Sequence, residues 1–455
     1  MTTMKAKFLI TLSISAGTIF LLGCKKQLEI EPRTQLGNEA ALKNVELMLG
    51  GAYSLVGSGG IPNSQEGALY GCNLLLMGDL LASEDYIRWR GTYTQFSEVA
   101  NQAISPGNTG AELLWRKGYS AINLCNSILE NLGGLSTEKQ KLYGGQAKFL
   151  RAIVHFELSR FFGSNITGLG VPILIKSTPD FTAITYPARA TIAEVNDQVI
   201  ADLLQAEADL PDENPDADLA SKVTAQAFLA RVYLHIGKYD LALAKSNEVI
   251  SSGLFSLVPS PEDAFNSSTS TESVFQIQQT TINNAGTTND GLTTFYSCST
   301  ETPGSAFRGD VQIDSLFINQ YEVTDKRRSI LIYIGDCNKA STTSGKWKNP
   351  YSNIPVIRLA EILLIRAEAN VRLGSEVGLA PLTDVNALRT RAGATPRMSV
   401  SLDSVLVERD LELAFEGHRI HDYRRTSRLI LPKYVLPIPQ TEINTNTKLD
   451  QNPTY

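Results

Sequence analysis

The residues best suited to chemistry lie together in one short segment, Asp85–Tyr93. Its nine residues include three aromatic rings and two arginines, and they carry no helical apolar stripe: Tyr86, Arg88, Trp89, Arg90 and Tyr93. An exposed ring covers the apolar face of a flat ligand, while charged groups hydrogen-bond its polar rim. Arginines favour ligands that bear carboxylate or sulfate groups. The segment therefore predicts a ligand-binding site, and the alternative is that its rings simply pack beneath a loop.

A second group of aromatic residues lies far along the chain, at Phe295-Tyr296, with Phe307 and Arg308 nearby. We predict Tyr296 as a further ligand contact. Trp115 and Trp347 are interpreted as structural, because one begins a packed helix and the other precedes an apolar helical stretch.

Catalytic and metal-binding motifs are missing from the sequence. It contains neither a G-x-S-x-G nucleophile elbow nor a G-x-x-x-x-G-K-[ST] phosphate loop. His418, His421 and Asp422 have a helical spacing that could hold a metal, but Arg419, Arg424 and Arg425 surround them with positive charge that would repel a cation. We predict no catalytic residue, no metal and no cofactor, and His155 and His235 are expected to be core residues.

The N-terminus has the layout of an export signal. Lys5 and Lys7 precede the apolar run Phe8–Leu22, which is too short for a comfortable membrane span. The run ends in Leu21-Leu22-Gly23-Cys24, which resembles the lipobox of bacterial lipoproteins, in which the cysteine is lipidated. We predict a signal peptide over residues 1–23 and lipidation at Cys24; the alternative is an ordinary signal followed by a chance cysteine.

The composition excludes several classes of protein. The 455 residues include 41 Lys+Arg and 47 Asp+Glu, a net charge of −6, and only 19% of residues are charged. An acidic chain without a long basic run makes nucleic acid an unfavourable partner.

Among the cysteines, Cys298 and Cys337 lie in loop-rich sequence and could form a disulfide, while Cys72 and Cys125 lie in apolar helical stretches and are expected in the core.

Apolar residues recur at helical spacing through most of residues 24–455, which we predict to form one mainly α-helical domain. Lys222–Ser252 is the clearest unit, with small alanines at the crossing of two helices and a turn at Gly237. A looser counterpart spans Ile357–Ala392, with a break at Gly374. Both resemble tetratricopeptide hairpins, stacked into a scaffold. Residues 256–350 are rich in Ser, Thr, Asn and Gly, and we predict that they form a large irregular region with short strands such as Val274–Ile277.

A helix that begins at Leu402 places Arg409 and Glu416 on its apolar face. Because an unpaired buried charge is costly, we predict that these residues form ion pairs with a neighbouring segment that carries Arg358 and Glu361. The alternative is a catalytic carboxylate.

Several runs of sequence resemble the SusD/RagB lipoproteins of Bacteroidetes. In chain order they are Phe149–Ala152, Phe162-Gly163, Val171-Pro172, Ala225–Leu234, Ile357–Ala369, Val385–Gly393, Glu412–Arg425, Leu436–Pro439 and Gln451–Tyr455. The matches extend from the lipobox to the last residue. One departure is Thr454, which replaces the glycine that is usual in that tail.

The resemblance implies an α-helical fold with four tetratricopeptide-like hairpins that support an irregular half. It also implies a non-enzymatic lipoprotein of the outer membrane, facing the cell exterior, that captures an oligosaccharide or a peptide for a partner SusC-like TonB-dependent transporter. In such proteins the stretch that corresponds to Asp85–Tyr93 often contributes to the ligand site. A periplasmic helical-repeat scaffold lipoprotein is the rival interpretation.

Overall fold

The structure is a computed structural model that describes residues 44–57, 69–178, 182, 184–214, 216–281, 284, 290–298, 307–334, 342–428 and 433–455. The predicted signal peptide, Cys24 and Cys337 lie outside these residues. Within the described ranges, no helix combines the length and the apolar character that crossing a bilayer requires.

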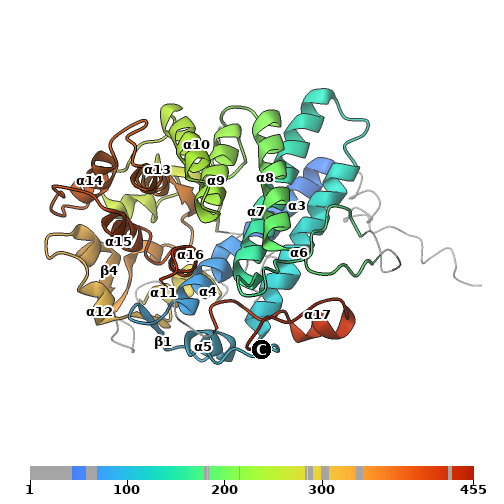
Figure 1. The fold of residues 1–455 in the computed structure, drawn as a ribbon, viewed down its shortest axis with the longest axis horizontal. Helices are drawn as coiled ribbons and strands as arrows, with labels where there is room; N and C mark the ends of the chain where they lie inside the picture. The colour runs from blue at the N-terminus through green and yellow to red at the C-terminus, as the bar shows by residue number, and fades with distance from the viewer. Residues whose placement is uncertain are drawn as a thin grey trace, which may run out of the picture.

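Helices dominate the architecture, as predicted, and the longest ones pack side by side (Figure 1). The scaffold helices are α3 (Val45–Gly57), α6 (Thr109–Glu130), α7 (Thr137–Phe162), α8 (Ile192–Asp209), α9 (Lys222–His235), α10 (Tyr239–Ser251), α13 (Leu359–Leu373), α14 (Pro381–Arg391) and α15 (Leu402–Glu412). Each of α6 to α10 packs on the next, and α10 packs on α13, so the hairpins stack in chain order. Shorter helices complete the fold: α4 (Leu74–Leu81), α5 (Thr94–Ala100), α11 (Leu292–Tyr296), α12 (Ser315–Ile318), α16 (Arg419–Arg425) and α17 (Gln440–Thr445).

Helices α9 and α10 confirm the predicted hairpin. Ser221 accepts a hydrogen bond from the Thr224 backbone N–H and so caps the start of α9. Gly237 turns the chain with a φ of +76°, a conformation that glycine adopts without steric cost. Ala227 and Ala230 are fully buried at the crossing, where small side chains let the helices approach closely.

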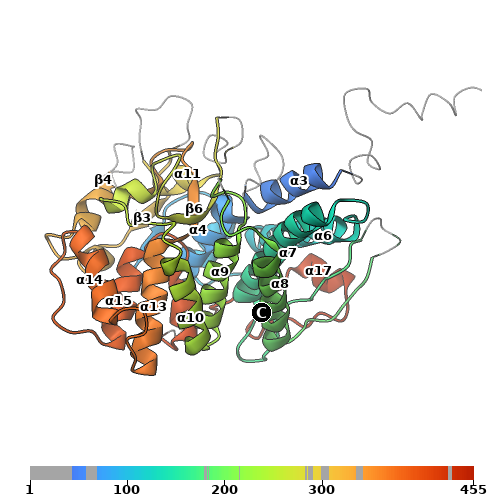
Figure 2. The ribbon, with the colours of Figure 1, turned by 90° about the horizontal axis from the view of Figure 1, so that it is seen from above.

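In the part of the irregular half that the structure describes, the strands form three two-stranded antiparallel sheets. Their strands are β1 (Ile87–Trp89) with β3 (Val311–Ile313), β2 (Ser273–Ile277) with β6 (Ile354–Arg358), and β4 (Ile332–Ile334) with β5 (Thr342–Ser344). Strand β2 confirms the run predicted at Val274–Ile277. In Figure 2 this half, marked by β3, β4 and α11, lies at one end of the molecule, across from α6 and α8.

The C-terminal helix is shorter than predicted, since α15 ends at Glu412 and Glu416 lies in the turn that follows. In this turn Phe415 and Gly417 have φ of +65° and +76°. A Cβ on Gly417 would lie 2.7 Å from the Leu75 Cα, so the turn packs directly on the backbone of α4. The absence of a side chain at Gly417 permits this approach.

The predicted ion pairs involve this turn. Arg358 at the end of β6 donates to Glu416, Glu412 and Glu272, which confirms the expected pairing of Glu416 with Arg358. Arg409 pairs with Asp422 instead, and Glu361 pairs with Arg231 on α9. These carboxylates serve as ion-pair partners.

Cys72 and Cys125 are buried free thiols, as predicted. Cys298 is disulfide-bonded. Its predicted partner, Cys337, lies outside the described residues.

Thr454 has a φ of +80°, which lies in the region that favours glycine. This backbone conformation explains why glycine is usual at this position of the tail. The Thr454→Gly variant is therefore expected to raise the free energy of unfolding by about 1 kcal/mol, because a β-branched residue is strained at positive φ. Urea denaturation measures the difference. Thr454→Ala keeps the strain and should gain less, and a loss of stability in Thr454→Gly contradicts the prediction.

Candidate ligand-binding site

Strand β1 positions the central part of the predicted site. It pairs with β3 in the register Arg88 to Gln312 and Trp89 to Val311. Because successive side chains of a strand point to opposite faces, Arg88 and Trp89 point in opposite directions. The Arg88 side chain is 67% exposed and forms an ion pair with Asp314 at 2.7 Å, whereas Trp89 is half-buried.

The Trp89 ring belongs to an aromatic patch, which we define as Trp89, Tyr93, Phe96 and Phe295. The Trp89 ring centroid lies 5.1 Å from that of Phe96 and 5.6 Å from that of Phe295, and Tyr93 lies 6.0 Å from Phe295. These tilted and edge-to-face contacts are favourable geometries for aromatic pairs. The patch therefore brings Phe295 of α11 onto the segment that follows β1.

Two arginines lie next to the aromatic patch. The Arg308 guanidinium carbon lies 4.6 Å from the centre of the Tyr93 ring, and Arg308 also pairs with Asp310. Arg90 is exposed beside Trp89, and its backbone N–H donates to the Asp310 carbonyl oxygen at 2.7 Å. Half-buried rings edged by arginines can stack on a ligand face and bond its rim.

Two of the predicted ligand contacts are buried. Tyr86 is 1% exposed and Tyr296 is fully buried, so neither ring is presented to a ligand at the surface. Tyr86 packs between Phe317 and Phe415, at 4.7 Å and 5.4 Å between ring centroids. Both tyrosines are core residues, and their buried hydroxyl groups bond internal partners.

The internal partner is Asp79 on α4, which we did not single out as a site residue. The Tyr296 hydroxyl donates to its Oδ2 at 2.5 Å, and the Gly417 backbone N–H donates to its Oδ1 at 3.1 Å. Burial raises the pKa of Asp79 to about 7, although these hydrogen bonds act to lower it. The available signal was a lone aspartate in the otherwise apolar run Leu74–Leu81.

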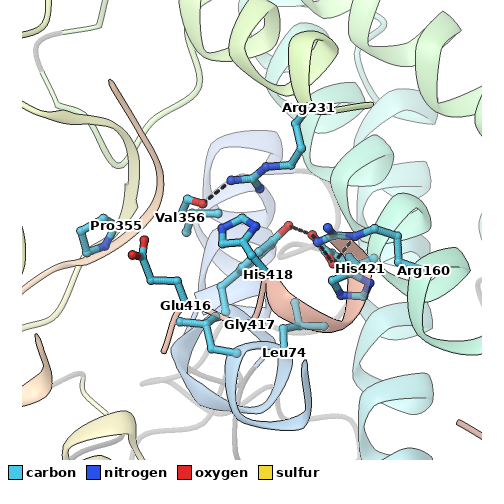
Figure 3. Close-up of a pocket in the computed structure, with 12 residues that line it drawn as sticks. Leu74, Arg160, Arg231, Pro355, Val356, Glu416, Gly417, His418 and His421 are labelled. Atoms are coloured by element: carbon cyan, nitrogen blue, oxygen red, sulfur yellow. Dashed lines mark hydrogen bonds and ion pairs between the residues drawn. The ribbon is translucent and has the colours of Figure 1, made fainter. Parts of the chain in front are cut away.

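A polar cavity lies between α4, α7, α9 and the turn at Gly417 (Figure 3). Figure 3 shows the His418 ring pointing toward Arg231, with Arg160 and His421 to one side. The cavity holds about 20 Å³, enough for one water molecule and too little for an organic ligand. Burial lowers the pKa of His418 to about 4, so this imidazole is neutral at pH 7.

The histidine and aspartate cluster has its own partners. Asp422 pairs with Arg409 at 3.2 Å and Arg425 at 2.7 Å, and His421 packs edge-on against Phe161. Within the described part of the chain, no three or more His, Cys, Asp or Glu side chains are grouped so that they could hold a metal ion. His155 is buried as predicted, and its Nδ1 is 3.0 Å from the Arg151 carbonyl oxygen, whereas His235 is partly exposed. Trp115 and Trp347 are both buried structural residues, also as predicted.

Two family models match the chain. The model described as "Starch-binding associating with outer membrane" matches residues 82–234, and the model described as "SusD family" matches residues 331–429. Together these matches span more than half of the chain and include both β1 and the ion-paired turn after α15.

Individual proteins resemble the chain over nearly its full length. SusD-like protein P2 from Formosa agariphila is 26% identical over 511 residues, which cover 96% of this chain and 97% of that protein. A SusD superfamily structure from Bacteroides thetaiotaomicron has a TM-score of 0.78 at 24% identity and covers 90% of this chain and 99% of its own. The structure of a "Laminarin binding SusD-like protein" has a TM-score of 0.73 at 22% identity, with 90% and 99% covered. With the fold, the signature runs and both family models in agreement, the chain belongs to the SusD/RagB family.

Proposed function

We propose that the protein captures a glycan at the cell surface and delivers it to a partner SusC-like TonB-dependent transporter of the outer membrane. The observation that carries the proposal is the aromatic patch, in which the rings of Trp89 and Tyr93 are half-buried, Arg308 contacts Tyr93, and the exposed Arg90 follows Trp89 in the chain. Carbohydrates combine apolar C–H faces with polar rims, and this patch offers partners for both.

The relatives support a carbohydrate as the ligand. One matching family is described as starch-binding, and one structural neighbour is described as laminarin-binding. The arginines at the edge of the patch favour a glycan with carboxylate or sulfate groups. No catalytic step is part of the proposal, and we expect purified protein to leave every ligand intact.

The proposed location depends on Cys24. Lipidation there would anchor the protein in the outer membrane, because several acyl chains together bind a bilayer firmly. We propose that the anchored protein faces the cell exterior. Radiolabelled palmitate incorporated by the wild type and lost in Cys24→Ala tests the anchor. Co-purification with the transporter tests the partner.

The Trp89→Ala variant is expected to lose glycan affinity by about thirtyfold, since a ring at the centre of a binding surface contributes about 2 kcal/mol. Isothermal titration calorimetry of residues 25–455 against a panel of neutral, acidic and sulfated oligosaccharides measures this loss. Tyr186→Ala is the matched control, because Tyr186 is a 43% exposed aromatic residue outside the patch.

Wild-type affinity in Trp89→Ala, with the folding of both variants verified by their melting temperatures, would remove the patch as the binding site.

A peptide panel run beside the glycans tests the alternative of a peptide-uptake lipoprotein. A periplasmic scaffold predicts binding to neither panel. Hydrolysis of any panel member would overturn the non-enzymatic assignment.

A further inference from the structure

A second pocket, of about 590 Å³, opens on the helical side of the molecule. We call it the α8 pocket, since Thr191, Ile192 and Ala193 at the start of α8 form one wall. The lining also contains His235 at the end of α9 and Arg424 and Arg425 of α16. Its volume lies within the range of pockets that hold small molecules.

Arg424 is the unusual residue of this pocket. Its guanidinium donates to two neutral acceptors, the carbonyl oxygens of Arg160 and Gly163, the latter at 2.8 Å. Among the residues that the structure describes, no carboxylate pairs with it, and its Nε–H has no hydrogen-bond partner. Partly buried arginines are ordinarily paired with an anion.

The neighbouring arginine provides the contrast. Arg425 forms two hydrogen bonds with Glu368, at 2.6 Å and 2.7 Å, and one with Asp422 at 2.7 Å. Its charge is therefore balanced inside the protein, while that of Arg424 is not. No carboxylate is among the side chains that line the described pocket.

The other groups in the pocket suit a polar ligand. The pKa of His235 is far below its usual value because of burial and the nearby Arg160, Arg424 and Arg425, so the ring is neutral and can donate or accept a hydrogen bond. Asn165 and Asn196 add two amide groups. Thr191 and Glu194 form a capping box, which gives partners to backbone N–H groups at the start of α8. The N-terminus of this helix is therefore not what attracts a ligand to the pocket.

We propose that the α8 pocket binds a small carboxylate-bearing molecule whose carboxylate pairs with Arg424. Asn165, Asn196 and His235 hydrogen-bond the polar remainder of the ligand. This site is separate from the aromatic patch and does not depend on the function proposed for it.

The test compares D-glucuronate with D-glucose, because the two differ by a carboxylate on the same ring. Isothermal titration calorimetry with residues 25–455 at low salt is expected to give at least tenfold tighter binding of glucuronate, as for a charge-assisted hydrogen bond. Arg424→Gln should abolish this preference, and added NaCl should weaken it. Trp89→Ala should leave it unchanged, which separates this site from the patch.

Arg424→Gln could fail to fold, because Arg424 bonds two buried carbonyl groups. Ala193→Asp provides an independent test, since Ala193 is exposed at the pocket wall and an aspartate in the first turn of a helix is favourable for folding. It should lower the affinity for glucuronate about tenfold by charge repulsion, whereas the neutral control Ala193→Asn should not. Equal affinities for glucuronate and glucose, or a preference that survives Ala193→Asp, would overturn the proposal.

Discussion

Replacing Arg358 by methionine is expected to lower the free energy of unfolding by about 3–5 kcal/mol, the usual cost of removing one partner from a buried ion pair. The Arg358 side chain is 1% exposed, and its guanidinium pairs with three carboxylates, those of Glu272, Glu412 and Glu416. Its Nη2 also donates to the Glu412 carbonyl oxygen at 2.8 Å. Methionine fills similar space but leaves these buried negative charges with fewer counter-charges.

Arg88→Met is the matched control. Arg88 also pairs with a carboxylate at 2.7 Å, but its side chain is 67% exposed. Since water screens such a pair, the control should cost less than about 1 kcal/mol. Urea denaturation measures both variants, and Arg358→Lys, which keeps the charge but cannot bond three carboxylates in the same plane, should fall between them. A loss below 1 kcal/mol in Arg358→Met would contradict the prediction.

The expected size of this effect follows from what the ion pairs connect. Glu272 precedes β2, Glu412 ends α15, and Glu416 lies in the turn that packs on α4. Arg391 of α14 pairs with both Glu272 and Glu412. The charges therefore join the irregular half to the helical scaffold, and the irregular half includes the strand that presents Trp89.

Local sequence predicted the scaffold well because local forces determine it. The helical period, the alanines of α9 and the turn at Gly237 depend on residues within a few positions of one another. The burial of Glu416 beside Arg358 followed from the cost of an unpaired charge on an apolar face. The helix end at Glu412 was missed, because the non-glycine residue Phe415 adopts a positive φ that its sequence does not suggest.

The aromatic site was predicted only in part because long-range pairing determines which rings are exposed. In β1 the neighbouring side chains alternate between faces, and the register with β3, more than two hundred residues away in sequence, fixes which face is outward. Tyr86 and Trp89 lie in the same short segment, yet Tyr86 is buried whereas Trp89 is only half-buried. Tyr296 is also buried, and its hydroxyl bonds Asp79, which lies 217 positions away in sequence.

Titration of Asp79 is expected to lower the free energy of unfolding of the wild type by about 3 kcal/mol between pH 5 and pH 8, and the Asp79→Asn variant should lack this decrease. The pKa of Asp79 is raised to about 7 in the folded protein, whereas an unfolded aspartate titrates near 3.8. Between these values the native state holds a proton that the unfolded state releases, so the wild type loses stability as the pH rises toward 7. Above pH 7 this contribution is constant. Asparagine keeps the shape and a hydrogen-bond acceptor but does not titrate.

Urea denaturation of both proteins at pH 5, 6, 7 and 8 isolates the effect, because every other titrating group is common to the two. The free energy of unfolding of the wild type, minus that of Asp79→Asn, should be larger at pH 5 than at pH 8. Asp314→Asn is the control, since the Leu316 backbone N–H and Arg88 lower the pKa of Asp314 and its contribution is constant above pH 5. A difference for Asp79→Asn that does not change with pH would mean that the Asp79 carboxylate is ionised throughout. In that case the hydrogen bonds from Tyr296 and Gly417 would stabilise a buried anion instead of a neutral acid.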